Sequence, residues 1–430
     1  MRLLWIATKP PVPPVDGGRL VALTTLQALA AEGVEITLVA PVPPGADRRR
    51  LEEELEGICR PVLVPATPRG RLTSALRSAL GGPPWAIGRH TLPAVAREVE
   101  RIVAAGGIDA VHAEQLQAFA QAEPALRAGV PVVLRAQNVE SDLWRAAARI
   151  RDLLPPGAGP WLAREARRLA RHEGEAVRRA TVTVALTERD AERLRELAEA
   201  GEQAGGAPPG QDPADGKPRV VAVPPPFPAE LPPGDEPLPG EPAVVLLGSG
   251  GWLPNRDGTR WFLEEVWPTV RQRLPGAVLH LFSAPGDLPR RLRRNLPDGV
   301  TPHPPPAESR QAFAPGSVLV VPLRFASGIR MKILEAWARG VPVVATPEAA
   351  AGLGVEKPGA EGGRGVVLAR DRGGFAAALG RLGAVGEFRE ELIRAGRSSV
   401  EHECGSEKVA ARLLRSYAAL TRRPATPSPR

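Results

Sequence analysis

The sequence has 430 residues but only two cysteines, and it contains no long uninterrupted apolar run. Cys59 and Cys404 lie far apart and neither belongs to a Cys-x-x-Cys pair, which argues against a disulfide framework and a cysteine zinc site. This cysteine usage fits a reducing cytoplasm. In MRLLWIATKPPVPP, prolines end the apolar run before a signal-peptide core is complete. No window approaches the roughly 18 apolar residues of a membrane span, so we expect no transmembrane segment.

Lysine is also scarce, and almost all the positive charge is arginine. The formal net charge is +8 and the sequence pI is about 10.3. Such a surface attracts acidic partners, for example nucleotide phosphates or an anionic membrane face. Basic chains also include nucleic-acid binders, but no recognition motif accompanies the charge here, and we expect no nucleic-acid partner.

Short β-type runs alternate with helical stretches, which predicts an α/β fold with parallel sheets covered on both faces. The strands expected in the first half are Leu3–Ala7, Glu35–Val39, Val62–Val64, Asp109–Val111, Val132–Leu134 and Val182–Ala185. Those expected in the second half are Ala243–Leu247, Val278–Phe282, Ser317–Val321 and Val343–Ala345. The chain is too long for one ordinary core, so we predict two Rossmann-like domains in series.

A proline- and glycine-rich stretch separates the two halves. Sequence of this composition buries too little apolar surface to offset its ordering entropy, although one short strand, Arg219–Val223, is expected within it. The predicted division is a first domain at 1–200, an insertion and linker at 201–241, a second domain at 242–405, a C-terminal helix at 406–423 and a disordered tail at 424–430. Whether the C-terminal helix crosses back to the first domain is left open.

The stretch FASGIRMKILEAWARG follows the last strand but one of the second half. Ligands of open α/β sheets bind at the carboxyl ends of strands. Ser327 is a suitable N-cap residue, and Gly328 permits a close approach of the backbone. A helix that begins here directs its first N–H groups to the edge of the sheet, where a phosphate is favoured.

The charges in the same stretch allow two interpretations. Arg330 and Lys332 lie in the first turn, where they oppose the helix dipole, and this arrangement makes sense if they hold an anion. In the alternative interpretation Glu335 pairs with Lys332 and Arg339 on a solvated face.

Several blocks of sequence resemble one family in the right order. ASGIRMKILEAWARGVPVVAT resembles the donor-site signature of the retaining glycosyltransferases of family 4, in a branch that typically reads SGTRLKILEAMA.G.PVV.T. Other blocks that resemble this family are KPPVPPVDGGR, VHAEQLQ, QNVESDLW and GSGGWLPNRDGTRWFLEEVWPTVRQRLPGAVLHL. The resemblance covers nearly the whole chain outside the proline-rich insertion and the tail.

Membership would imply a GT-B fold, in which two Rossmann-like domains face each other across a cleft. It would imply a nucleotide-diphospho-sugar donor in the second domain, as a co-substrate rather than a cofactor, and a glycan or lipid-linked acceptor in the first. The implied reaction is sugar transfer to an acceptor hydroxyl with retention, in cell-surface polysaccharide or glycoconjugate synthesis.

The resemblance also implies roles for individual residues. Glu335 matches the glutamate expected to hold the ribose hydroxyls, and Arg330 and Lys332 match catalytic positions near the diphosphate, where cations offset developing charge. Gly17 and Gly18 match the glycine loop after the first strand, although they also fit a plain strand-to-helix turn. The remaining donor-binding residues expected from the resemblance are Gly250, Ser327 and Gly328.

His112 is a further candidate catalytic residue. It ends the expected strand Asp109–Val111, and Glu114 lies just beyond it. This polar pair is placed to hydrogen-bond the transferred sugar, whereas the alternative is a strand-end histidine that caps the next helix.

No Asp-x-Asp occurs in the sequence. Enzymes that hold a diphosphate through a divalent metal usually need clustered carboxylates, so we expect a metal-independent site in which cationic side chains and helix amides replace the ion. Gln137 stands where many relatives have histidine, and Ala351 where the branch commonly has glutamate. These departures motivate an alternative, a catalytically silent relative that binds nucleotide or glycan in a polysaccharide-assembly complex. An inverting enzyme or a nucleotide-sugar epimerase would share the architecture.

Trp161–Arg179 predicts an arginine-rich helix whose apolar stripe includes Glu173. A carboxylate on such a stripe costs stability unless it is paired or near water, so Glu173 either reaches the cleft or pairs with an arginine. Basic amphipathic helices also bind anionic membranes. Because the apolar face is mostly alanine and leucine, we favour packing within the domain. A cytoplasmic protein is expected, with a peripheral location at the inner membrane face left open.

Overall fold

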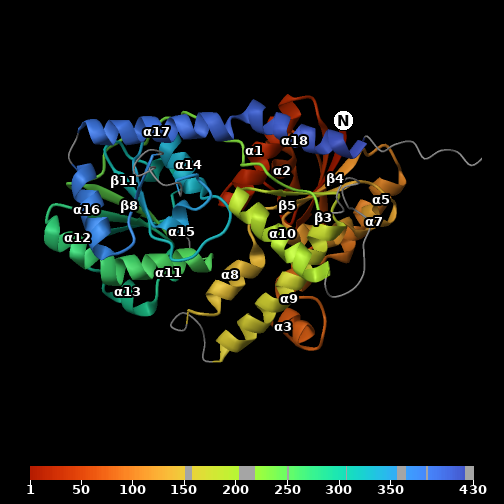
Figure 1. Cartoon of the computed structure of the whole chain (residues 1–430), viewed down its shortest axis with the longest axis horizontal. Coiled ribbons are helices and arrows are strands. Elements are labelled where there is room, and N and C mark those ends of the chain that lie inside the picture. Colours follow the sequence, from red (N-terminus) through yellow and green to blue (C-terminus); the bar gives the residue numbers. More distant parts are fainter. Residues whose placement is uncertain are drawn as a thin grey trace, which may run out of the picture. The chain divides into compact units, whose positions relative to one another are not determined.

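The structure is a computed structural model that describes residues 1–150, 157–202, 218–248, 251–306, 308–355, 365–383 and 386–421. These residues form two compact units (Figure 1). The first unit contains the described parts of Met1–Ala148, Gly157–Pro226 and Ser406–Arg430. The second contains those of Arg149–Pro156 and Phe227–Gly405.

The first unit is built on a seven-stranded parallel sheet with the order β3-β2-β1-β4-β5-β6-β7. Its strands are β1 (Arg2–Ile6), β2 (Glu35–Val42), β3 (Arg60–Pro65), β4 (Ala110–Glu114), β5 (Val132–Ala136), β6 (Val182–Ala185) and β7 (Val220–Ala222). Its helices are α1 (Gly17–Ala31), α2 (Arg48–Glu54), α3 (Arg71–Ala79), α4 (Trp85–His90), α5 (Pro93–Ala104), α6 (Leu116–Phe119), η1 (Ala120–Ala122), α7 (Glu123–Arg127), α8 (Glu140–Ala147), α9 (Ala158–Arg179), α10 (Glu188–Glu202) and α18 (Ser406–Thr421).

The second unit is built on a six-stranded parallel sheet with the order β10-β9-β8-β11-β12-β13. Its strands are β8 (Ala243–Leu247), β9 (Val278–Phe282), β10 (Val300–His303), β11 (Val318–Val321), β12 (Val343–Ala345) and β13 (Val366–Leu368). Its helical segments are α11 (Leu253–Trp261), η3 (Phe262–Val266), α12 (Trp267–Arg273), η4 (Pro285–Asp287), α13 (Arg290–Arg294), η5 (Ser309–Ala312), α14 (Met331–Ala338), α15 (Pro347–Ala350), α16 (Arg372–Gly383) and α17 (Glu387–Cys404). The two parallel sheets confirm the predicted α/β class.

The core of the first unit lies on both faces of its sheet. Leu4 and Ile6 of β1 pack into one apolar cluster, and Leu3 and Trp5 pack into the other, as the alternation of side chains along a strand requires. The second cluster also contains Tyr417 and two further apolar residues of α18. The C-terminal helix therefore completes the core of a sheet that the N-terminal half of the chain builds.

The observed segments differ from the expected ones at the linker. Val220 and Val221 belong to β7, which pairs in parallel with β6 as the last strand of the first sheet. Both are β-branched residues, which suit a pleated strand. The short strand expected at Arg219–Val223 is therefore confirmed, but it belongs to the sheet of the first unit rather than to a linker, and residues from Phe227 onward belong to the second unit. Residues 203–217 and the predicted tail 424–430 lie outside the described residues.

Candidate functional site

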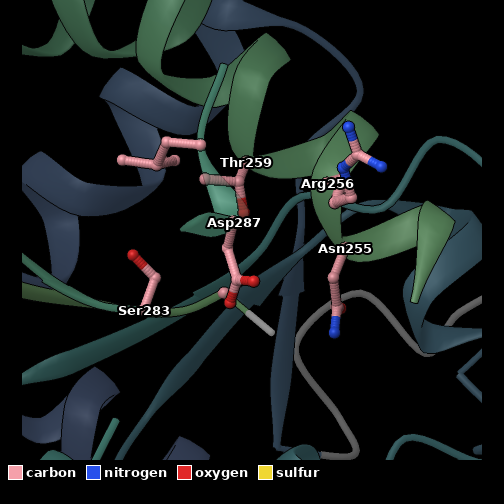
Figure 2. Close-up of a pocket in the computed structure, with 7 residues that line it drawn as sticks. Asn255, Arg256, Thr259, Ser283 and Asp287 are labelled. Carbon is pink, nitrogen blue, oxygen red and sulfur yellow. The ribbon is translucent and has the colours of Figure 1, made fainter. Parts of the chain in front are cut away.

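A small pocket lies at the carboxyl ends of β8 and β9 in the second unit. Asn255, Arg256 and Thr259 of α11 line it from one side, and Ser283 and Asp287, which follow β9, line it from the other (Figure 2). Gly248 and Leu288 complete the lining. The pocket thus lies at the edge of the sheet where open α/β folds bind ligands.

Lys332 connects the end of β8 to α11 beside this pocket. Its Nζ donates hydrogen bonds to the carbonyl of Leu247, at 2.8 Å, and to Oδ1 of Asn255, at 3.3 Å. Burial among protein atoms, with the nearby charge of Arg330, lowers the pKa of Lys332 to about 7. A new anion at this position would favour the ammonium form. Lys332 therefore offers a charge that an anionic ligand can recruit.

The segment before α14 differs from the expected helix start. α14 begins at Met331, with Arg330 in the N-cap position and no side-chain cap, because Gly328 has a φ of 74° and interrupts the helical conformation. The prediction that Ser327 caps this helix is therefore wrong. Arg330 is buried, donates to the carbonyl of Ser327 and lies 4.8 Å from the ring centroid of Trp252. The cation thus packs against the loop that joins β8 to α11.

Glu335 lies on the buried side of α14. It accepts a hydrogen bond from Nε of Arg339 at 3.0 Å and another from the hydroxyl of Ser309. The alternative interpretation is therefore confirmed for the pair of Glu335 with Arg339. It is wrong for the solvated face, because only 8% of the glutamate is exposed, and for Lys332, which bonds to Leu247 and Asn255 instead. The carboxylate is held in one position by a cation and a hydroxyl.

An ion pair between a buried aspartate and an exposed arginine fixes the loop after β11 to α11. Asp257 of α11 is fully buried and accepts from Nε of Arg324 at 2.8 Å. A Cβ placed on Gly258 would lie 2.4 Å from the carbonyl oxygen of Pro322, so only glycine allows this approach. The segment after β11 is therefore held closely against α11.

The corresponding edge of the first unit is formed by polar side chains that follow β4 and β5. Gln137 donates from Nε2 to the carboxylate of Glu114, at 2.7 Å, and to the carbonyl of Gly18, at 3.1 Å. Gln115 donates to Oε1 of Gln137 at 2.8 Å. A Cβ on Gly18 would lie 2.9 Å from Oε1 of Gln137, so the glycine lets two amide side chains pack against the start of α1, where Gly17 is the first residue.

Gln115 is the one described residue other than glycine with a positive φ, 73°. Its ψ is 154°, a combination that is essentially restricted to glycine and is strained for other residues. Three hydrogen bonds hold it there: its N–H donates to the carbonyl of Arg135, its side-chain oxygen accepts from Thr8, and its amide donates to Gln137. The local sequence carries no signal for this strain.

His112 lies inside β4 rather than at its end, and its ring is fully buried. It stacks on Trp5 with ring centroids 3.7 Å apart. Its Nε2 lies 3.1 Å from Glu114 and its Nδ1 lies 2.7 Å from the hydroxyl of Tyr417. Burial lowers the pKa of His112 despite the neighbouring carboxylate, so the neutral ring donates to Glu114 and accepts from Tyr417. The expectation that His112 faces the open edge of the sheet is wrong.

Glu114 remains ionised although only 3% of it is exposed. Burial would raise its pKa, but the charge of Arg135 and the hydrogen bonds from His112 and Gln137 hold the pKa below its usual range. The network therefore contains a buried carboxylate with three polar neighbours. Sequence reasoning identified His112 and Glu114 but missed Arg135, Gln115 and Tyr417.

Glu173 was expected either to reach the cleft or to pair with an arginine, and the structure shows a different set of partners. It is buried in α9 and accepts hydrogen bonds from the N–H groups of Glu140 and Ser141, at 2.8 and 3.2 Å, and from the hydroxyl of Ser141, at 2.7 Å. Burial raises the pKa of Glu173 to about 8. The carboxyl group therefore caps the start of α8, and among the residues that the structure describes no arginine forms a salt bridge with it.

The remaining expectations concern Gly250, Ala351, metal binding and membrane-spanning helices. Gly250 lies outside the described residues, and Ala351 is a buried residue directly after α15. Within the described ranges, no three histidine, cysteine or acidic side chains gather where they could hold a metal ion. No helix in the described part of the chain is both long and apolar enough to span a membrane.

Two family descriptions match this chain. Residues 241–384 match "Glycosyl transferases group 1", and residues 16–204 match "Glycosyl transferase 4-like domain". No curated protein sequence matches the chain.

Solved structures resemble the whole chain at low sequence identity. Anabaena HepE in complex with UDP and glucose has a TM-score of 0.64 at 14% identity, over 97% of this chain and 100% of that chain. A glycosyltransferase from Rickettsia africae gives 0.63 at 9%, over 98% and 99% of the two chains. The α,α-trehalose 6-phosphate synthase of Burkholderia multivorans gives 0.60 at 14%, over 98% of each. This likeness concerns the fold, and it confirms the expected GT-B architecture.

Proposed function

We propose that this chain, which belongs to the group 1 glycosyltransferases, transfers a sugar from a nucleotide-diphospho-sugar to an acceptor hydroxyl with retention of anomeric configuration. The bond between the anomeric carbon and the diphosphate oxygen breaks, and a bond from that carbon to the acceptor oxygen forms. The leaving diphosphate helps to take the acceptor proton. The acceptor is a glycan or a lipid-linked glycan of a cell-surface pathway.

The observation that carries the proposal is the position of Lys332. Its Nζ is fixed between the carboxyl end of β8 and Asn255 of the pocket wall, with Arg330 one residue before α14. A preorganised cation at the edge of a sheet stabilises charge that develops on a leaving group. In the proposal both cations face the diphosphate, which requires no metal ion, and Glu335 holds the ribose hydroxyls.

The base of the donor is proposed to be uracil. Anabaena HepE, which has a similar fold, is described in complexes with UDP, with UDP-glucose, and with UDP and glucose. The likeness in sequence is only 14%, so UDP is the first ligand to test rather than a conclusion from homology.

One observation favours a second candidate function, a silent relative that binds nucleotide or glycan. The side chain of Gln137, which replaces the histidine of many relatives, is committed to Glu114 and to the backbone of Gly18. This packing gives Gln137 a structural role at the first unit's edge. The silent relative would bind a nucleoside diphosphate and turn over no donor.

The test combines binding with turnover. UDP, GDP and ADP are compared for thermal stabilisation, since a ligand that binds only the folded form raises the melting temperature. Slow hydrolysis of the matching nucleotide-sugar is then measured in the parent, Lys332→Ala and Glu335→Ala, with Glu265→Ala, an exposed glutamate of the same unit, as the control. We expect hydrolysis only in the parent and the control. Equal hydrolysis in all four would reject the site, and nucleotide binding without turnover of any donor would favour the silent relative.

A further inference from the structure

Helix α3 of the first unit buries its serines and exposes its leucines. Ser74 and Ser78 are 3% and 0% exposed, whereas Leu72, Leu76 and the C-cap residue Leu80 are 86%, 62% and 79% exposed. The leucines are four residues apart and so lie on one face of the helix. They are half of the six large apolar residues that are exposed in the described part of the chain. Clustered exposure of this kind marks an interaction surface.

The inverted orientation of α3 is fixed by a buried carboxylate of α9. The hydroxyl of Ser78 donates to Glu165 at 2.8 Å, and the N–H of Trp85 donates to the same carboxylate at 2.7 Å. Arg168 pairs with Glu165 at 2.8 Å and donates to the carbonyl of Ser78 at 2.9 Å. These contacts hold the serine side of α3 against α9; Figure 1 shows the two helices next to each other. The leucines are therefore held outward by specific bonds.

The sequence around α3 is entirely without acidic residues. From Gly57 to Arg97 there is no aspartate or glutamate. The arginines of this segment are Arg60, Arg69, Arg71, Arg77, Arg89 and Arg97. Arg71 and Arg77 lie on α3 itself and are exposed. Neither arginine of α3 forms a salt bridge within the described part of the chain. A leucine face next to such arginines matches a surface that is apolar inside and negatively charged at its boundary.

We infer that α3 docks the protein on an anionic lipid bilayer. Leu72, Leu76 and Leu80 enter the boundary between headgroups and acyl chains, and Arg71 and Arg77 contact the anionic headgroups, as interfacial helices do. A second copy of the chain is a poor occupant, because a two-fold contact would set the same positive surface against itself. An acidic protein would satisfy the arginines, but three leucines in one row fit an acyl boundary better. The inference is independent of the proposed reaction.

The leucine face of α3 is not the membrane contact that the sequence analysis considered, which was the arginine-rich helix α9. The apolar stripe of α9 is buried, with Ala166 and Leu169 at 2% and 1% exposure, and its residue Glu165 supports α3. The arginine-rich helix thus packs within the unit, and α3 is the proposed membrane contact instead.

The test is sedimentation of the full chain with vesicles of phosphatidylcholine, with and without about 30% phosphatidylglycerol, at low and moderate salt. Two variants divide the surface: Leu72→Ser/Leu76→Ser removes the apolar part, and Arg71→Ser/Arg77→Ser removes the charge. The matched control is Arg49→Ser/Arg50→Ser, which removes the same charge from the exposed helix α2. Melting temperature and light-scattering mass are measured for each variant.

We expect the parent and the α2 control to bind anionic vesicles and the leucine variant to lose about tenfold or more in binding. The arginine variant should lose its dependence on anionic lipid and on salt. Unchanged binding in the leucine variant would overturn the inference, as would equal binding of the parent to neutral vesicles. A parent dimer that the leucine variant converts to a monomer, with no vesicle binding by either, would assign the face to a second copy instead.

Discussion

In the proposed site, Lys332 would make nucleotide binding depend on pH in the direction set by its lowered pKa. The pKa of Lys332 is lowered to about 7, so at about pH 8 only about a tenth of the free protein carries the ammonium. Its two acceptors, the Leu247 carbonyl and Asn255, are satisfied by a neutral amine, which still has two N–H donors. A diphosphate beside Nζ would raise the pKa again, typically by 1–3 units.

The expected magnitude follows from this shift. With a shift of this size, binding of UDP should be accompanied by uptake of about 0.4–0.9 of a proton at about pH 8, and by almost none at about pH 6, where Lys332 is already charged. The affinity should be greatest below the pKa of the free protein. It should fall as the pH rises above about 7, by up to about tenfold per pH unit, which corresponds to about 1.4 kcal/mol.

Calorimetry of UDP binding in two buffers with different ionisation enthalpies measures the proton uptake directly. Lys332→Arg is the matched variant, because arginine keeps the charge but does not titrate, and it also reports any proton linkage of UDP itself. Lys332→Met removes both charge and titration. We expect uptake in the parent only, with weak binding in Lys332→Met. Equal uptake in the parent and in Lys332→Arg would refute the assignment of the anion site to Lys332.

Two further predictions concern the polar network of the first unit. Tyr417→Phe should lower the free energy of unfolding by about 1–3 kcal/mol, because the buried Nδ1 of His112 loses its hydrogen-bond donor. Urea denaturation measures this loss, with Ser416→Ala as the control. A loss below about 0.5 kcal/mol would contradict the role of Tyr417. Gln115→Gly should be more stable than Gln115→Ala by about 1 kcal/mol, since both lack the amide but only alanine keeps a Cβ at the positive φ. Urea denaturation compares the free energies of unfolding of the two variants, and equal values would show that the backbone at Gln115 is not strained.

The strands were predictable because parallel strands buried on both faces are continuous apolar, β-branched runs. The expected bounds of β6, β8, β9 and β12 coincide with the observed ones. β10 and β13 were missed. Two of the four residues of β10 are proline and histidine, so β10 has no continuous apolar run. β13 is as short as β12 and fully apolar, and its length does not explain why it was missed.

Local sequence failed where a backbone conformation or a distant contact decides the structure. Ser327 followed by Gly328 has the pattern of a helix start, but the positive φ of Gly328 delays the helix to Met331. Tyr417 contacts His112 across 305 positions of sequence, and no periodicity connects the two. The resemblance to a family located Lys332 and Glu335, whereas their observed partners come from β8, α11 and η5.

The departures from the family pattern bear differently on binding and on turnover. Gln137 belongs to the first unit, where it joins Gly18 and Glu114, whereas Lys332 and Arg330 belong to the second. The side-chain amide of Gln137 accepts a hydrogen bond from Gln115 and donates to Glu114 and Gly18. A glutamine in place of a histidine at this position therefore leaves no polar atom of the amide unsatisfied. Nucleotide affinity should therefore report on the second unit regardless of Gln137. A chain that binds UDP with the pH dependence of Lys332 but turns over no donor would show that the loss of activity does not come from loss of the anion site at Lys332.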